Sequence, residues 1–248
     1  MSSSDLEQKP VTLHVVPLSH PCMTVRYALE HKGLEYEEVV LPSGQHSGTV
    51  EEIYGEGHTT VPGIVIGGEP VHGSVTILEY LERAIPENPL YPEAIAAEVS
   101  EAERWGDEIF QELARRLPFG ALHFRPGSMG TFAGAGELDA AGTDFAIKAV
   151  RGAWKYQGLS AVRLTEDLAE LPDAIARVES YAEAGLIDGD EPTAADLQLA
   201  SSARVLMTMG DLHPLLDGSA AERIAMRYFP DYEGQIPAGA FPPGWVKD

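Results

Sequence analysis

The sequence predicts an α/β domain followed by an all-helical domain in a chain of 248 residues. Within the first 85 residues, short β-rich runs alternate with segments of helical spacing. A Pro-rich stretch follows, and beyond it nearly every periodic segment has helical spacing. We therefore expect the α/β domain over residues 1–85, a linker over 86–92 and the helical domain over 93–248.

The first domain is expected to have the order βαβ, a loop, then ββα. Val11–Val16 and Tyr36–Leu41 are β-rich runs that flank a helical segment beginning near Pro21. A Gly-Gly pair at 67–68 separates two further short runs, as in a hairpin. Ser74 precedes apolar residues at helical spacing, which predicts an amphipathic helix with Ser74 as its N-cap. This order is typical of a small α/β layer fold.

The remaining segments are predicted to be helical, apart from two stretches. The polar, Gly-rich stretch after Pro42 is expected to be a loop, and residues 118–142 a long irregular connection. A Pro/Gly-rich tail over 230–248 is expected to be extended, either packed by its aromatic residues or loose. The predicted helices of the second domain cover residues 94–117, 143–155, 159–171, 172–184, 193–209 and 220–228.

The composition excludes several classes of protein. With 44% hydrophobic residues the chain is expected to fold. The chain has 17 basic and 39 acidic residues, and the resulting net charge of −22 disfavours nucleic acids and anionic membranes as partners. A single cysteine, Cys22, excludes an internal disulfide and a cysteine-based zinc site, and we expect no metal. No signal peptide or membrane-spanning run is seen, so we expect a cytoplasmic protein.

A first candidate site lies at the predicted junction of the first strand and helix, in the sequence Ser19-His20-Pro21-Cys22. A helix N-terminus favours an anion, including a thiolate. Ser19 could therefore donate a hydrogen bond to a bound thiolate, or it could simply cap the helix. Cys22 could be a redox nucleophile, or a buried and inert residue of the apolar stripe.

Two further candidates follow in the first domain. Thr60-Val61-Pro62 could form a cis-proline turn that exposes the Val61 backbone to an extended peptide, or Pro62 could simply begin a strand. Gly73-Ser74 could bind a ligand carboxylate at the start of a helix, or Ser74 could serve only as a cap.

These residues together resemble the glutathione transferase superfamily. The stretch from Ser19 to Arg26 is similar to the catalytic loop of its serine and cysteine classes. Val61-Pro62 and Gly73-Ser74 are similar to its cis-proline strand and the start of its γ-glutamyl-binding helix. Thr193 to Asp196 is similar to its N-capping box, in which the two residues cap each other's backbone amides. The resemblance implies a thioredoxin-like first domain.

The resemblance also implies a site. It makes Ser19 or Cys22 catalytic and glutathione, or a related small thiol, the co-substrate. A hydrophobic electrophile would lie between the domains near Trp105 and residues 118–142, in a homodimer. The sequence departs from the family at Gly73, where an acidic residue or Gln usually contacts the ligand amine. The residues expected to hold the thiol are Thr60, Val61, Pro62, Gly73 and Ser74.

Three functional hypotheses follow. The first is a transferase in which Ser19 stabilises the thiolate of glutathione for attack on an electrophile. The second is a thiol–disulfide oxidoreductase that uses Cys22, which requires an exposed thiol of low pKa. The third is a non-catalytic binding or interaction protein that retains the fold, motivated by Gly73 and the altered loop before Val61.

Overall fold

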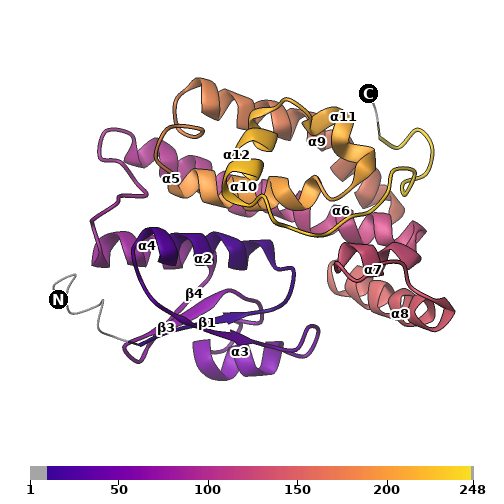
Figure 1. Ribbon diagram of the computed structural model, residues 1–248, viewed down its shortest axis with the longest axis horizontal. Coiled ribbons are helices and arrows are strands. Elements are labelled where there is room, and N and C mark those ends of the chain that lie inside the picture. Colours follow the sequence, from indigo (N-terminus) through magenta and orange to yellow (C-terminus); the bar gives the residue numbers. More distant parts are fainter. Residues whose placement is uncertain (1–9, 247–248) are drawn as a thin grey trace.

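The computed structural model describes residues 10–246, which form a sheet-containing domain and a larger helical domain (Figure 1). The sheet has the strand order β2-β1-β3-β4. β1 (Val11–Val15) pairs in parallel with β2 (Glu37–Val40) and antiparallel with β3 (Gly63–Ile66), which forms a hairpin with β4 (Glu69–His72). The predicted βαβ-ββα order and thioredoxin-like class are confirmed.

Helices cover both faces of this sheet. α2 (His20–His31) and α4 (Ser74–Ala84) pack together on the face toward the helical domain, and α3 (Ser47–Tyr54) lies on the other face (Figure 1). The prediction of a loop throughout the stretch after Pro42 was wrong, because α3 lies within it. Of the eight residues of α3 only Val50 is buried, so the sequence carries no apolar stripe that would reveal the helix.

The helical domain is arranged around α10 (Ala194–Leu206), in which every residue except Arg204 is buried. This helix contacts α12, α5 and α6 in its own domain and α2 in the first domain. Its N-terminus has the predicted capping box, confirmed by the Thr193 amide that donates to Asp196 and the Asp196 amide that donates to Thr193 Oγ1. The other α-helices are α5 (Ala96–Trp105), α6 (Gln111–Phe124), α7 (Met129–Phe132), α8 (Ala140–Tyr156), α9 (Ala161–Glu183), α11 (His213–Leu216) and α12 (Ala220–Tyr228).

The predicted irregular connection over 118–142 was wrong for most of its length and holds for residues 133–139. α6 continues through Pro118 to Phe124, and further short helices occupy residues 126–132. A side chain at Gly120 would meet the Leu164 side chain at 2.6 Å, so this glycine permits close contact between α6 and α9. Similarly, the two helices predicted around Pro172 form the single helix α9. A π-helical segment, Gly106–Phe110, joins α5 to α6.

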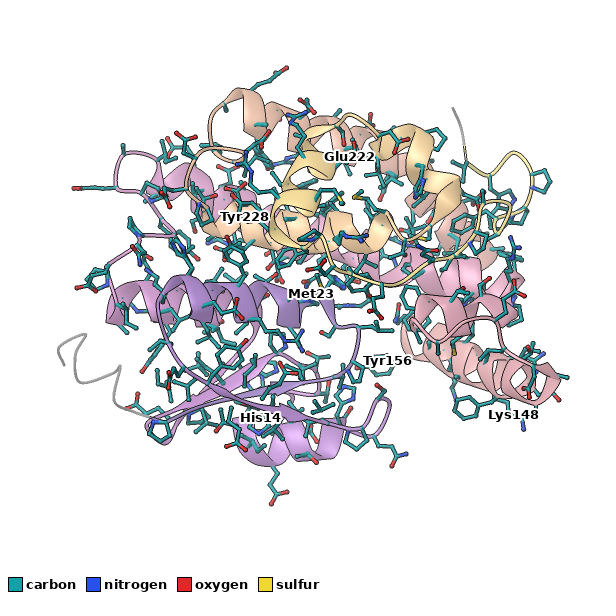
Figure 2. The ribbon with its side chains drawn as sticks, in the orientation of Figure 1. His14, Met23, Lys148, Tyr156, Glu222 and Tyr228 are labelled. Atoms are coloured by element: carbon teal, nitrogen blue, oxygen red, sulfur yellow. The ribbon has the colours of Figure 1, made fainter. Side chains whose placement is uncertain are left out.

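Buried polar contacts join the two domains. The Thr24 hydroxyl of α2 lies 2.9 Å from Ser201 Oγ and 3.2 Å from the Leu197 carbonyl oxygen of α10. Nearby, the Tyr27 ring of α2 contacts the Tyr228 ring of α12 edge-on, with centroids 5.3 Å apart. Figure 2 shows Met23 and Tyr228 in this zone, whereas Lys148 lies at the far end of the molecule. The relative position of the domains is therefore set by specific contacts.

The C-terminal tail is packed on the helical domain. The Arg204 side chain donates to the carbonyl oxygens of Phe229, Pro230 and Tyr232. The Asp211 carboxylate accepts hydrogen bonds from three consecutive backbone amides, those of residues 239–241. Of the two outcomes expected for the tail, the packed one is found.

A buried carboxyl group lies near the junction of the domains. Glu103 of α5 is fully buried and accepts a hydrogen bond of 2.6 Å from the Tyr91 hydroxyl in the segment between the domains. Within the described part of the chain its other oxygen has no hydrogen-bond partner. Burial raises the pKa of this carboxyl from 4.5 to about 8, and the charges of Glu79 and Asp107 add to the rise.

We predict that Glu103 makes the folded protein less stable as the pH rises from about 5 to about 8. Over that range the folded state holds a proton that the unfolded state has lost, so the free energy of unfolding falls with pH. The Glu103→Gln variant lacks this dependence. Thermal unfolding of both proteins is measured at about pH 5 and at about pH 8. The Tm of the wild-type protein is expected to fall relative to that of the variant between the two pH values. Parallel pH dependences in the two proteins would contradict the prediction.

Candidate active site

A cavity of about 300 Å³ lies between the two domains. From the first domain it is lined by all five residues expected to hold a thiol ligand. These five residues are Thr60, Val61, Pro62, Gly73 and Ser74, and Pro21 lies beside them. The opposite wall comes from the π-helical segment and the start of α6, with Asp107, Glu108, Gln111, Glu112 and Arg115.

The loop before β3 forms one side of the cavity. The Val61–Pro62 peptide bond is cis, so the open question about this turn is resolved in favour of the cis-proline form. The Pro62 carbonyl accepts a hydrogen bond of 3.0 Å from the Gly73 amide. A His72 ring nitrogen lies 2.7 Å from the Thr60 carbonyl oxygen, within hydrogen-bond distance. These two contacts fix the cis-proline loop against the start of α4.

The start of α4 differs in one respect from the prediction. Gly73, not Ser74, is the N-cap residue, and Ser74 is the first residue of the helix. Gly73 has a φ of 87°, a left-handed conformation that is strained for residues with a side chain. The backbone turn therefore gives a physical reason for glycine here. Ser74 lines the cavity beside the free amides of the first turn.

Ser19 occupies the N-cap position of α2, but its hydroxyl does not cap that helix. It acts instead on the neighbouring Cys22 thiol, whose pKa it lowers against the larger effect of burial. Ser19 is partly exposed and neighbours the lining residue Pro21, although Ser19 itself is not among the lining residues. The preceding residue, Leu18, has a φ of 64°, and its carbonyl accepts a hydrogen bond of 3.2 Å from the Tyr232 hydroxyl of the tail.

Cys22 has the environment of a core residue. Its side chain is fully buried, and burial raises the pKa of the thiol to about 11 against the opposing effect of the Ser19 hydrogen bond. At neutral pH the thiol is therefore protonated and shielded from solvent. This environment is the opposite of the exposed, acidic thiol that the oxidoreductase hypothesis requires.

We predict that Cys22 in the native protein reacts with a thiol reagent such as 5,5′-dithiobis(2-nitrobenzoate) at least about a hundredfold more slowly than in the denatured protein. Burial shields the thiol from the reagent, and by raising the pKa of the thiol it also lowers the fraction of thiolate, which is the reactive form. The absorbance of the released thiol follows the reaction, and the protein unfolded in guanidinium chloride is the control. A rapid stoichiometric reaction of the native protein would revive the oxidoreductase hypothesis.

The residues of the helical domain that line the cavity were not predicted from the sequence. Trp105 and residues 118–142 were expected to lie there instead. Trp105 stacks on Phe110, with ring centroids 5.8 Å apart, and neither it nor any residue of 118–142 lines the cavity. The signal that could have found the wall is the polar stripe at positions 107, 108, 111, 112 and 115, which recurs at helical spacing.

The wall carries both signs of charge. Arg115 forms an ion pair with Glu112, which also lies 2.9 Å from Arg116. Asp107 Oδ1 accepts hydrogen bonds from the side-chain amides of Gln111, at 2.9 Å, and Gln198, at 3.3 Å. Burial raises the pKa of the Asp107 carboxyl, and the neighbouring carboxylates Glu108 and Glu112 add to this.

Residues 10–246 contain neither a helix able to cross a membrane nor a group of three or more His, Cys, Asp and Glu side chains placed to bind a metal ion. The arrangement offers instead the backbone of Val61 beside the cis-proline, free amides and a hydroxyl at Ser74, and a carboxylate at Asp107. This set of groups suits a small polar peptide.

The fold and the site define a two-domain protein with a thioredoxin-like domain, a cis-proline loop and a helical second domain. A model of the glutathione S-transferase N-terminal domain matches residues 13–89. Glutathione S-transferase 1 of Dianthus caryophyllus is 39% identical over 95 residues. That match spans 38% of this chain and 42% of the relative, less than half of its length.

Solved structures match nearly the whole chain. A glutathione S-transferase from Rhodospirillum rubrum F11 superposes with a TM-score of 0.56 at 23% identity, over 94% of this chain and 96% of that one. A rice glutathione S-transferase in complex with glutathione gives 0.52 at 19%, over 89% and 83%. At these identities the likeness concerns the fold. Residues 13–89 are thus similar in sequence to the glutathione S-transferase N-terminal domain, and the described chain shares the fold of such proteins.

Proposed function

We propose that this protein is a glutathione transferase that binds glutathione in the cavity between its domains and activates the thiol for attack on an electrophile. The observation that carries the proposal is the meeting of the cis-proline loop and the start of α4 in one cavity. These two elements lie at either end of the β3–β4 hairpin, and the cavity joins them to a wall from the helical domain, which is far away in the sequence. The second substrate would enter between the domains.

Each end of this site suits a different part of the tripeptide. The backbone at Val61 can pair with an extended peptide, as in the addition of a strand. The free amides at the start of α4, together with the Ser74 hydroxyl, can bind a carboxylate, which the helix dipole also favours. Glutathione supplies both features, and the rice relative is described as a complex with it.

Ser19 is the proposed activating residue. Its hydroxyl is not used as a helix cap, and it already lowers the pKa of a neighbouring thiol, that of Cys22. A hydroxyl that turned to the sulfur of bound glutathione would stabilise the thiolate over the thiol. Attack by this thiolate forms a carbon–sulfur bond with the electrophile and expels the leaving group with the bonding electron pair.

The non-catalytic hypothesis keeps one supporting observation, since Ser19 does not line the cavity. In that case the protein would bind glutathione without lowering the pKa of its thiol. The resemblance further leads us to propose a homodimer, a cytoplasmic location, and domain boundaries within residues 86–92.

We predict that Ser74→Ala weakens glutathione binding by roughly tenfold to a hundredfold, because a hydrogen bond to a charged group contributes about 1.5–3 kcal/mol. Isothermal titration of the wild-type protein and the variant measures the loss. Ser43→Ala, at an exposed position outside the cavity, is the matched control and should bind as the wild type does. Equal affinity in all three proteins would remove Ser74 from the site.

We predict that Ser19→Ala raises the pKa of the bound glutathione thiol by about one pH unit, equivalent to about 1.4 kcal/mol. The ultraviolet absorbance of the thiolate in the complex, followed against pH, measures this without any knowledge of the electrophile. Glutathione affinity should stay within a few-fold of wild type at a pH where the bound thiol is neutral. If the bound thiol titrates identically in both proteins, Ser19 does not activate it.

A further inference from the structure

The helix α8 carries cations that have no partner in the described part of the chain. Lys148, Arg151 and Lys155 are exposed, and no hydrogen bond or ion pair joins their side chains to another described residue. Every other described lysine or arginine except Arg104 has an ion pair or a hydrogen bond. The only acidic residue of α8 is Asp144, so this helix is basic in a chain whose net charge is −22.

Two aromatic side chains stand on the same exposed face of α8. Phe145 is 69% exposed and Tyr156 70% exposed, the highest values among the large hydrophobic side chains of residues 10–246. They lie three helical turns, about 16 Å, apart along the axis. Ala149 and Gly152 are exposed between them, and a Cβ at Gly152 would meet nothing within 4 Å. Because glycine destabilises a helix relative to alanine, no contact within the described chain accounts for it here.

The opposite face of α8 is fixed to the helical domain. Ala146 and Val150 are its buried residues, and Trp154 Nε1 donates to the Phe119 carbonyl of α6 at 2.8 Å. The His123 ring of α6 stacks on the Trp154 ring, with 3.9 Å between their centroids. α8 lies at the edge of the molecule (Figure 1), and none of its residues lines the cavity. The proposed glutathione site therefore makes no use of the exposed face of α8.

The cations border the aromatic residues along this face. Positions 145, 149, 152 and 156 follow each other at spacings of three and four, which places them in one row along the helix. Positions 148, 151 and 155 have the same spacing and form the adjacent row. A segment lying along α8 would thus meet two rings with small residues between them, and a line of positive charge on one side. Apolar residues and carboxylates at helical spacing would complement both rows.

Charge complementarity distinguishes among anionic partners. A nucleic acid or an anionic membrane is an extended anion, so it would meet the negative charge of the rest of the chain as well as α8. A single acidic segment would meet only α8, because charges more than about 8 Å away are largely screened at physiological salt. The same face of a second copy is also disfavoured, because its cations would repel those of the first.

We propose that the exposed face of α8 is a docking surface for an acidic amphipathic helix of a partner protein. Apolar side chains of the partner would pack on the rings of Phe145 and Tyr156, and its carboxylates would pair with the three cations of α8. The surface lies outside the cavity, so this binding activity does not depend on the binding of glutathione.

The probe is a fluorescein-labelled peptide of about 16 residues, which as a helix is about 24 Å long. Leucines stand at positions i, i+4, i+7 and i+11, and the other positions are glutamate or alanine. The control peptide has lysine in place of every glutamate. Fluorescence anisotropy with the full chain should show saturable binding of the acidic peptide, weakened as NaCl rises from about 50 to about 500 mM. The lysine peptide should bind at least about tenfold more weakly.

Two pairs of variants locate the binding on α8. Arg151→Glu should weaken binding of the acidic peptide about fivefold, because it replaces an attraction by a repulsion. Arg104→Glu makes the same change at an exposed position on α5 and should bind as the wild type does. Phe145→Ala should weaken binding roughly tenfold, because it removes apolar contact area. Val40→Ala, at an exposed position on β2, is its control.

The outcomes that overturn the proposal are distinct from those that test the transferase. The proposal fails if the wild-type protein binds both peptides alike or binds neither, or if Arg151→Glu and Arg104→Glu lose the same affinity. It also fails if phosphatidylserine vesicles bind the protein through Arg151 and the acidic peptide does not, since the face is then a membrane surface. The comparison of two peptides on the wild-type protein is decisive even if a variant does not fold. Glutathione titration of the α8 variants should match the wild type, so the two proposals stand or fall separately.

Discussion

The packing of α2 against α10 is the constraint on which the cavity depends. Thr24 meets Ser201 and the Leu197 carbonyl where water is excluded, and removing a single partner there would cost about 1–3 kcal/mol. Since α2 is fixed on α10, its first turn lies near the start of α6, and Pro21 and Gln111 line the same cavity. The same helix, α10, holds Asp107 through Gln198. One buried helix thus sets the positions of both walls.

A net charge of −22 would oppose the approach of an anionic peptide, so local groups must decide binding. Charges more than about 8 Å away are largely screened at physiological salt, whereas backbone amides and a fixed carboxylate act at contact distance. Donors at the start of α4 would allow an acidic protein to bind the carboxylate of a small peptide.

Local signals explain what could be predicted from the sequence. The strands, α2, α4 and the Thr193 capping box each depend on neighbouring residues, and all were predicted. The cis form of the Val61-Pro62 turn was one of two alternatives that the local sequence left open. The errors depend on distant contacts. Gly120 suggested a flexible segment, but it lies against Leu164 in a helix. In α3 only one residue is buried, so no apolar periodicity indicates a helix there. The cavity wall at Asp107 could be predicted only with knowledge of how the domains pack, because the same polar stripe is typical of an ordinary solvated helix face.

The tail gives a last link between the fold and the chemistry. Leu18 has a left-handed backbone, which costs a residue with a side chain about 1–2 kcal/mol. The Tyr232 hydroxyl donates to the Leu18 carbonyl, and Arg204 of α10 donates to the Tyr232 carbonyl at 2.7 Å and lies over its ring. The turn that precedes Ser19 is therefore fastened, through the tail, to the same helix that holds Asp107. The backbone that carries Ser19 is therefore held in place by the tail and by α10, so the proposed role of this residue depends on contacts outside the first domain.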